Sequence, residues 1–505
     1  MCKSFRVSVV FPGLVAVVLA ISQVAFAGVA MQTTEPSASN PEKTKSTSKK
    51  TKKKKKKKTA SGSFVVFGTY SPQATTINST ALPVAIDTLS GTLDLVPATP
   101  AASSRRAVRA TKTPSVQLLP VDDPPANVAA TTLVISEFRV RGPNGANDEF
   151  IEIMNATGAD HTVAGGGSGY AVAASDGTTR CVIPNGTVIP NKGHYLCVNS
   201  VGYSLASYPA GNGTTATGDA TYTTDIPDNA GIALFNTSVS ANFNLANRFD
   251  AVGSTSEANT LYKEGTGYPA LTPFSIDYSF YRDNCGKGGS ITTFGPCPGG
   301  GLVQDSNNNA ADFVFVDTNG TSAGAGQRLG APGPENLSSP IERNASFNVA
   351  LLDVCVAAAS PPNRVRDFTS DPPNNSTFGT LDIRREVFNN TGGNVTRLRF
   401  RIVDLTTFPA PSGIADLRPR TSTAVVVTVD RPPCGSGTSN VTVNGTTLEQ
   451  PPSQPNGGGF NSSLSAGTVT LATPVANGAS VNLRFLLGIQ QTGSFKFFVN
   501  VEALP

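Results

Sequence analysis

The densest group of side chains that could carry chemistry is a set of four carboxylates in one short stretch. This acidic set consists of Glu137, Asp148, Glu149 and Glu152. Two carboxylates in a cleft can act as general acid and base, and carboxylate oxygens are also ligands that Ca²⁺ prefers. The simpler interpretation, which the sequence favours, is that these groups face solvent or form ion pairs with Arg139 and Arg141.

A second oxygen-rich stretch begins at Asp305 and reads Asp-Ser-Asn-Asn-Asn. It matches the first half of a calcium-binding loop, but Ala310 stands where that loop needs glycine and Val316 where it needs glutamate. An ordinary turn built on Asn and Asp side chains is therefore favoured. The alternative is a Ca²⁺ site of another kind, with the ligands Asp305, Asn307, Asn309 and Asp312.

Nucleophilic catalysis finds little support in the sequence. A serine nucleophile needs a base, and the only histidines are His161 and His194. No Gly-x-Ser-x-Gly motif stands between a predicted strand and a predicted helix, which is the context that a nucleophile elbow requires. The chain also has no Cys-x-x-Cys pair for a zinc site. We therefore expect no enzymatic activity and no cofactor, with Ca²⁺ as the one alternative.

Six of the seven cysteines follow the N-terminal signal described below and suit an oxidising compartment. Their proximity in the sequence favours the disulfides Cys181–Cys197, Cys285–Cys297 and Cys355–Cys434. The first of these is expected to close a hairpin of residues 179–183 and 194–198 around a turn at 184–187.

The N-terminus predicts export. Residues 1–27 have the basic start, apolar run and small-residue cleavage site of a secretory signal peptide. Residues 28–60 are rich in Ser, Thr and Lys and are predicted to be a disordered arm. The arm contains an unbroken basic run, namely Lys52, Lys53, Lys54, Lys55, Lys56, Lys57 and Lys58. This run is interpreted as a solvated spacer, with a tether for an anionic polymer or membrane as the alternative.

The elements that must position these residues are predicted to be strands. Gly and Pro total 86 of the 505 residues, and no sustained helical periodicity follows the signal, so an all-β fold is expected. Residues 61–130 are rich in Pro, Ala and Ser and are predicted to be a linker with short strands. Residues 131–340 and 345–505 are predicted to form two immunoglobulin-like β-sandwiches.

A stripe of arginines marks one predicted strand of the second sandwich. Leu398, Phe400 and Ile402 are expected on one face of that strand, and the opposite face then carries Arg397, Arg399 and Arg401. The favoured role of the stripe is cross-strand pairing with Asp382, Arg384 and Glu386 as its neighbours. The alternative is docking to an acidic glycan or to the acidic body of the chain itself.

The motifs of residues 131–340 occur in an order that resembles one known domain. Residues 133–155 contain Ile-Ser-Glu and Asp-Glu-Phe-Ile-Glu in two strands, Arg282 ends a later strand, Asp312-Phe313 follows an Asn-rich loop, and 332–336 reads Pro-Gly-Pro-Glu-Asn. Together they resemble the lamin-tail domain, an immunoglobulin-like sandwich of nuclear lamins and of many secreted bacterial proteins. The opening motif is carried by Glu137, Glu149, Phe150, Glu152 and Asn155.

This resemblance implies a secreted scaffold or adhesive protein of bacterial origin, located outside the cell or on its surface, with a partner that the sequence does not identify. Chromatin binding is not expected, because the chain has a signal peptide and lacks the heptad rod of lamins. No transmembrane segment is expected in the mature chain. The alternative function is an accessory module of a secreted metal-dependent hydrolase or nuclease, with the acidic set near Glu137 as its site.

Overall fold

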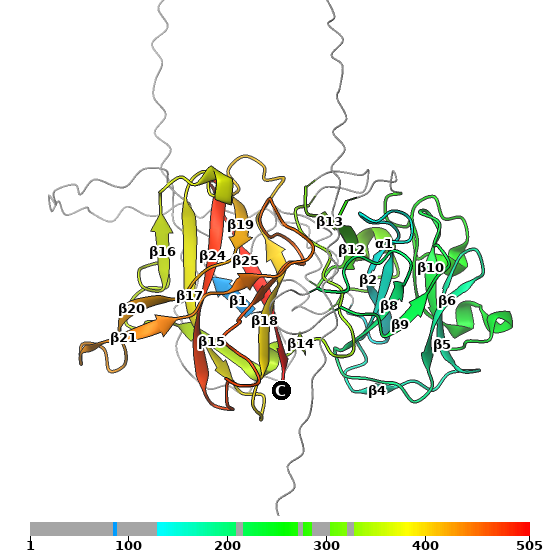
Figure 1. Cartoon of the computed structure of the whole chain (residues 1–505), viewed down its shortest axis with the longest axis horizontal. Helices are drawn as coiled ribbons and strands as arrows, with labels where there is room; N and C mark the ends of the chain where they lie inside the picture. Colours follow the sequence, from blue (N-terminus) through cyan, green and yellow to red (C-terminus); the bar gives the residue numbers. More distant parts are fainter. Residues whose placement is uncertain (1–83, 88–128, 209–215, 271–275, 285–302, 321–327) are drawn as a thin grey trace, which may run out of the picture. The chain divides into compact units, whose positions relative to one another are not determined.

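A computed structural model describes residues 84–87, 129–208, 216–270, 276–284, 303–320 and 328–505. These residues form mostly antiparallel β-strands, as the composition predicts (Figure 1). No helix among them is long and apolar enough to cross a membrane. The predicted signal peptide, the lysine run and the Cys285–Cys297 pair lie outside the described residues.

The first sandwich consists of a six-stranded and a four-stranded sheet. The larger sheet has the order β13-β12-β2-β3-β8-β9, with the strands β2 (Leu133–Arg139), β3 (Phe150–Asn155), β8 (His194–Asn199), β9 (Ala220–Tyr222), β12 (Tyr278–Arg282) and β13 (Phe313–Asp317). The smaller sheet has the order β11-β10-β5-β6, with β5 (Gly169–Ala174), β6 (Thr179–Pro184), β10 (Ile232–Phe235) and β11 (Arg248–Val252). Side chains from both sheets, such as Ile135 and Val172, form one apolar core.

Short elements complete this sandwich. They are the strand pair β4 (His161–Thr162) and β7 (Val188–Ile189), the helical turn α1 (Asn309–Asp312), and the 3₁₀ turns Ser240–Asn242, Leu245–Asn247 and Thr260–Tyr262. The two predicted opening strands are confirmed as β2 and β3, which pair antiparallel.

A β-bulge in β2 decides which way its acidic residue points. Ile135 pairs with Ile153 and Glu137 pairs with Glu152, so Ser136 is an extra residue on β2. An extra residue reverses the alternation of faces along a strand. Ile135 before the bulge and Phe138 after it therefore both face the core, and Glu137 lies on the opposite face beside Glu152.

The second sandwich also packs two sheets around one core. One sheet has the order β1-β25-β18-β23-β22, with β14 also paired to β25, and its strands are β1 (Val84–Asp87), β14 (Ile341–Glu342), β18 (Arg397–Leu405), β22 (Thr447–Leu448), β23 (Ser463–Ser465) and β25 (Phe497–Leu504). The other has the order β15-β17-β24-β19, with β16 also paired to β17, and its strands are β15 (Phe347–Leu351), β16 (Arg364–Asp367), β17 (Thr380–Asn389), β19 (Asp416–Arg420) and β24 (Ser480–Gln491). Turns of 3₁₀ type occur at Asn344–Ser346 and Pro372–Asn374.

The predicted faces of the arginine strand are confirmed. On β18, Leu398 and Phe400 lie in the core of the second sandwich, whereas Arg399 and Arg401 lie on the other face. The predicted neighbours of this stripe are wrong, because β17, which carries Asp382, belongs to the opposite sheet and pairs with β24 instead.

A strand from the predicted linker belongs to the second sandwich. β1 pairs antiparallel with β25, across a separation of about four hundred residues. β25 itself also pairs with β18 and β14, so the last strand of the described chain is an internal strand of its sheet.

Two of the three predicted cysteine pairs are disulfide-bonded in the structure, with Cα–Cα distances of 6.3 Å for Cys181–Cys197 and 5.6 Å for Cys355–Cys434. The hairpin predicted around the first pair is wrong. β6 pairs with β5 and β8 pairs with β3, so the disulfide connects the two sheets instead of two neighbouring strands. The second disulfide joins the loop after β15 to the ribbon of β20 (Val425–Asp430) and β21 (Thr438–Val443).

Candidate functional site

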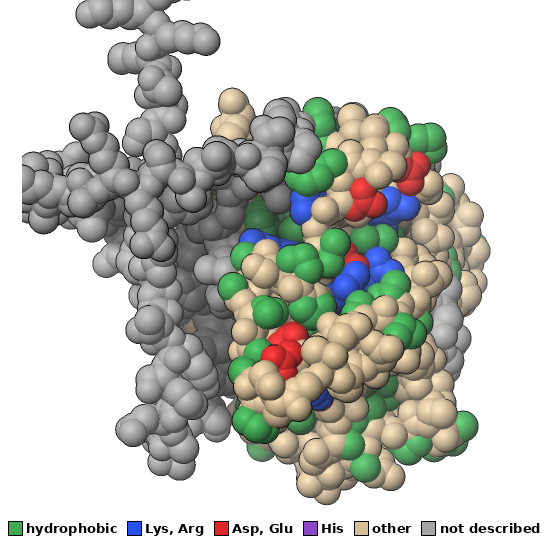
Figure 2. Space-filling model, turned by 90° about the vertical axis from the view of Figure 1, so that its left-hand side faces the viewer, with side chains coloured by type: hydrophobic (Ala, Val, Ile, Leu, Met, Phe, Trp, Pro, Cys, Tyr) green, Lys and Arg blue, Asp and Glu red, His purple; other side chains and the backbone are tan. Residues whose placement is uncertain are grey.

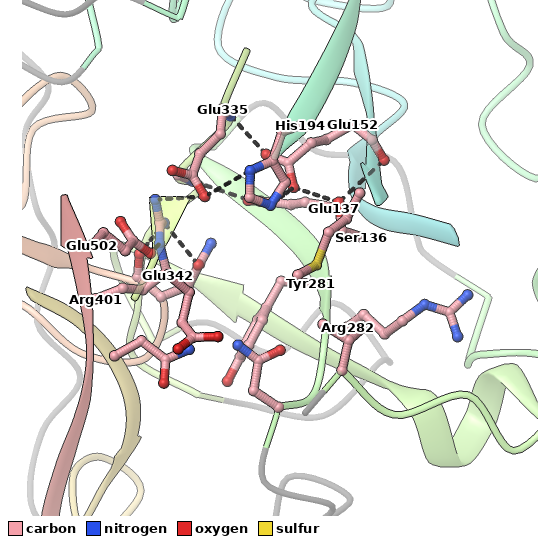
Figure 3. A pocket seen from close by; sticks show the side chains of 16 residues that line it. Ser136, Glu137, Glu152, His194, Tyr281, Arg282, Glu335, Glu342, Arg401 and Glu502 are labelled. Carbon is pink, nitrogen blue, oxygen red and sulfur yellow. Dashed lines mark hydrogen bonds and ion pairs between the residues drawn. The ribbon is translucent and has the colours of Figure 1, made fainter. Parts of the chain in front are cut away.

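Ionisable side chains gather where the outer face of the β2-β3-β8 strands meets β18 and β25 of the second sandwich. We call this group the seam cluster, and it consists of Glu137, Glu152, His194, Glu335, Arg399, Arg401, Glu449 and Glu502. All eight side chains are buried. A cavity of about 50 Å³ lies among most of them and is also lined by Ser136 and Tyr281 (Figure 3).

The carboxylates of Glu137 and Glu152 enter the cluster from neighbouring strands. The bulge in β2 places Glu137 on the outer face, and regular alternation with Ile151 and Ile153 places Glu152 there on β3. Each accepts a backbone N–H from the Pro-Gly-Pro-Glu-Asn segment. Gly333 N–H donates to Glu137 Oε1 at 3.0 Å, and Glu335 N–H donates to Glu152 Oε2 at 2.6 Å. Glycine is required at 333, because a Cβ there would collide with the Arg401 guanidinium. The segment singled out by the resemblance thus packs onto the two opening strands.

Glu335 lies between the two sandwiches and is held by arginines of the second. It forms ion pairs with Arg399 and with Arg401, the latter at 3.4 Å. Arg399 and Arg401 each also pair with Glu502, which lies beside them on β25. Burial alone would raise the pKa of Glu335, but Arg401, His194 and Arg399 hold this pKa below its ordinary value. Glu335 is therefore a buried carboxylate that stays ionised.

Three other carboxyls of the cluster have raised pKa values. Burial raises the pKa of Glu137, and it raises that of Glu152 further because the charges of Glu137 and Glu335 add to the effect. Burial also raises the pKa of Glu449 to about 7. Five carboxyl groups face two guanidinium groups in the cluster, which would leave three negative charges in excess if all were ionised. Burial is thus the main cause of the raised pKa values, and neighbouring carboxylates add to it at Glu152.

His194 begins β8 and points between two carboxylates (Figure 3). Its Nδ1 is 3.5 Å from Glu335 Oε2, and its Nε2 is 3.7 Å from Glu152 Oε1. Both distances exceed those of ordinary hydrogen bonds. Nδ1 has no hydrogen-bond partner among the described residues. Burial lowers the pKa of His194, so the imidazole is neutral near pH 7.

A second ionic group surrounds Arg282 at the end of β12. Arg282 pairs with Asp250 at 2.5 Å, Asp305 at 3.5 Å and Asp312 at 3.7 Å. Carboxylate oxygens of Asp250, Glu264 and Asp305 also lie within 4.8 Å of one another. The Arg282 guanidinium thus already supplies a positive charge to the acidic residues around it.

The predicted calcium ligands lie in this region but do not converge. Asp312 accepts the backbone N–H groups of Ser306 and Asn308, as in a turn built on side-chain acceptors. Asn309 accepts the N–H groups of Gly253 and Glu264. Asp305 pairs with Arg282, and the Asn307 backbone donates to Asp305. The oxygens of Asp312 and Asn309 thus hold the loop, and Ca²⁺ binding by these four residues stays a prediction.

The four residues of the acidic set lie in different surroundings in the structure. Only Glu137 and Glu152 share a site. Asp148 forms a buried ion pair with Arg139, as the simpler interpretation proposed for part of the set. Glu149 accepts N–H groups from Ile226 and from the Asn199 side chain, and burial raises its pKa to about 8.

The remaining residues of the resemblance motif are structural. Phe150 is buried and packs with Leu196 and Tyr208 on the outer side of the sheet. The Asn155 side chain donates to the carbonyls of Ala159 and Ile189 and thereby shapes the turn after β3.

The sequence named most members of the seam cluster without showing that they meet. His194 was weighed only as a base for a serine nucleophile, Glu335 only as part of a motif, and Glu502 was not singled out. Glu502 carried a usable signal, because it is an acidic residue that alternates with Val499 and Val501 in an apolar strand. A charge in such a strand predicts that its second face is buried against a partner of opposite charge.

Comparison with known proteins gave no matching family model, no matching curated protein and no matching solved structure.

Proposed function

We propose that this chain is a secreted, non-catalytic binding or scaffold protein, in which two joined β-sandwiches follow a basic arm. The observation that carries the proposal is that the ionisable groups of the seam cluster are buried and paired with one another. The seam cluster is buried and largely paired with itself, and its cavity of about 50 Å³ admits a water molecule or an ion. Sites for organic ligands are typically about 300–1,000 Å³. These carboxylates therefore hold the fold together and do not face a substrate.

The two disulfides among the described residues support an oxidising environment, in agreement with export. The lamin-tail resemblance supports the scaffold role, since its Gly333 and Glu335 segment makes backbone contacts with the opening strands and forms part of the packing. The surface shown in Figure 2 carries few charged side chains, and acidic and basic groups lie near one another on it. This face is suited to neutral contacts.

The test measures catalysis and retention in the same protein. Purified full-length chain is assayed against phosphodiester and ester substrates with and without divalent metal ions, beside Glu152→Gln. We expect no turnover in any sample. Metal-dependent turnover that Glu152→Gln abolishes would overturn the proposal and favour the hydrolase or nuclease alternative.

The binding role is tested by location in the producing cells. A deletion of residues 49–58 is compared with the full chain after fractionation and a salt wash. Retention of the full chain at the surface, with release of the deletion variant, identifies the arm as an electrostatic tether. Equal release of both assigns the arm as a spacer and moves the search for the partner to the loops of the sandwiches.

A further inference from the structure

We propose that the seam cluster holds one divalent transition-metal ion, for which Zn²⁺ is the best fit, bound by Glu152, His194 and Glu335. The ion has a structural role, because its ligands come from β3, from β8 and from the segment that leads into the second sandwich. This inference concerns how the molecule is held together and does not depend on the proposed binding function.

The geometry is that of ligands around a shared ion. One nitrogen of His194 and one oxygen from each of Glu152 and Glu335 lie within 4.8 Å of one another, and all three side chains are buried. The separations of 3.5 and 3.7 Å between ring nitrogens and carboxylate oxygens are too long for hydrogen bonds. Two ligands placed about 2.1 Å from a tetrahedral Zn²⁺ ion lie roughly 3.4 Å apart. Whichever ring nitrogen binds the ion, its separation from the nearer carboxylate oxygen thus matches the edge of such a site.

His194 supplies an independent indication. Its side chain is 7% exposed, and Nδ1 has no hydrogen-bond partner among the described residues. A buried polar atom without a partner is costly, and an ion would remove that cost. Because carboxylates lie beside both ring nitrogens, binding through one nitrogen leaves the other N–H facing a carboxylate. This is the usual arrangement of metal-bound histidines.

The charge and the donor types select the ion. Five carboxyls and two guanidiniums leave an excess of negative charge at the seam, which a divalent cation reduces. One imidazole and two carboxylates suit Zn²⁺ and related transition ions, whereas Ca²⁺ takes oxygen ligands only. The group of Asp250, Glu264 and Asp305 offers no imidazole and no buried histidine nitrogen without a partner. The seam is therefore the better cation site.

The test measures metal in the full-length chain with its disulfides intact. The chain is stripped with a chelator, incubated with Zn²⁺, Co²⁺ or Ca²⁺, desalted, and analysed for bound metal by mass spectrometry. We expect one Zn²⁺ or Co²⁺ per chain and no retained Ca²⁺, and a rise in the unfolding temperature with Zn²⁺ or Co²⁺ but not with Ca²⁺. Absence of stoichiometric Zn²⁺ and of a thermal shift in the wild-type chain would overturn the proposal.

Matched variants locate the ion. Glu152→Gln keeps the shape of the side chain and should weaken Zn²⁺ binding at least about tenfold. Losing a residue that only hydrogen-bonds to a metal ligand already has an effect of that size. His194→Gln should remove the visible absorption bands of a Co²⁺–imidazole site. His161→Gln is the control, because this histidine contacts Tyr170 away from the seam. Loss of Zn²⁺ in the His161→Gln variant would contradict the assignment. So would loss of Zn²⁺ in a Cys285→Ser/Cys297→Ser chain if Glu152→Gln still binds the ion.

Discussion

At the scale of single residues, the buried arginines of β18 determine whether the seam is stable. Arg399 is completely buried and pairs with Glu335 and Glu502. Replacing pairs of this kind by apolar residues can be neutral, but removing one partner leaves a buried charge without compensation.

We therefore expect Arg399→Met to lower the free energy of unfolding by about 3–5 kcal/mol, because Glu335 and Glu502 lose a shared partner in a buried site. Arg397→Met on the same strand is the matched control, since Arg397 is only half-buried, and it should cost about 1 kcal/mol or less. Urea unfolding of both variants measures the difference. Equal losses in the two variants would mean that Arg399, with its buried ion pairs, contributes no more to stability than the half-buried Arg397 does.

A second residue-scale prediction concerns pH. Burial raises the pKa of Asp219 to about 6, while it accepts the N–H groups of Leu196 and Leu337. The raised pKa means that the folded state holds this proton more tightly than the unfolded chain does. Its stabilising contribution is full below about pH 4 and is lost as the pH rises through about 6.

Asp219→Asn keeps an oxygen acceptor and cannot ionise, so it should gain stability relative to the wild type as the pH rises from 4 to 7. The measurement is the difference in unfolding temperature between the two chains at each pH, which cancels the titration of the other groups. A difference that stays constant across this range would show that Asp219 does not titrate there.

At the scale of elements, the bulge at Ser136 sets the faces of β2. Deleting Ser136 removes the extra residue, and Ile135, Glu137 and Phe138 then alternate regularly between the two faces, opposite Ile153, Glu152 and Ile151. We expect this deletion variant to keep the native fold with Phe138 in the core, which an unchanged near-ultraviolet circular dichroism signal would show.

Ser136→Ala is the matched control, because it keeps the bulge and removes only the hydroxyl that donates to Glu152. This variant should fold with a loss of about 1–3 kcal/mol, the usual cost of leaving a buried acceptor without its donor. A deletion variant that unfolds while Ser136→Ala folds would show that the local twist of the bulge is required for the packing of β2.

A feature of these elements could be predicted from the sequence when it depends on residues within one strand, and not when it depends on which strands pair. Alternation along 397–402 assigned the two faces of β18 correctly, because that pattern lies within one strand. The hairpin expected at 179–198 was wrong, because adjacent segments joined different sheets. The bulge at Ser136 had no local signal, since the apolar pattern around it fits either face.

At the scale of the whole molecule, the seam makes the two sandwiches depend on each other. The outer face of the six-stranded sheet in the first sandwich is buried, and Glu335 links that sandwich to arginines of the second. Leu329 and Gly330 also make backbone hydrogen bonds or bridges with Phe408 and Phe460. These contacts predict that neither sandwich is stable without the other.

Calorimetry of the full chain should therefore show one unfolding transition, with a calorimetric enthalpy equal to the van't Hoff enthalpy. Glu335→Lys places a third positive charge beside Arg399 and Arg401 and should lower the temperature of this single transition. Two separate transitions in the wild-type chain would mean that the seam is too weak to couple the sandwiches.

From the sequence, this coupling was predicted only as the alternative in which the arginine stripe docks to the acidic body of the chain itself, without a named partner residue. Arg399 and Glu335 are separated by 64 residues and Arg399 and Glu502 by 103, and no periodicity relates positions so far apart. The candidate metal ligands were missed for the same reason. Glu152 and His194 become neighbours only because β3 pairs with β8, and Glu335 joins them only when its segment crosses both strands.

The pairing of β1 with β25 has a consequence for how the protein is made. Residues 84–87 leave the ribosome long before residues 497–504, yet the later strand lies between β1 and β18 in the finished sheet. The second sandwich therefore cannot close during synthesis and must wait for its final strand. Until residues 497–504 have emerged, β18 lacks its neighbour in the sheet, and a product truncated before residue 497 would leave this sandwich open to proteases.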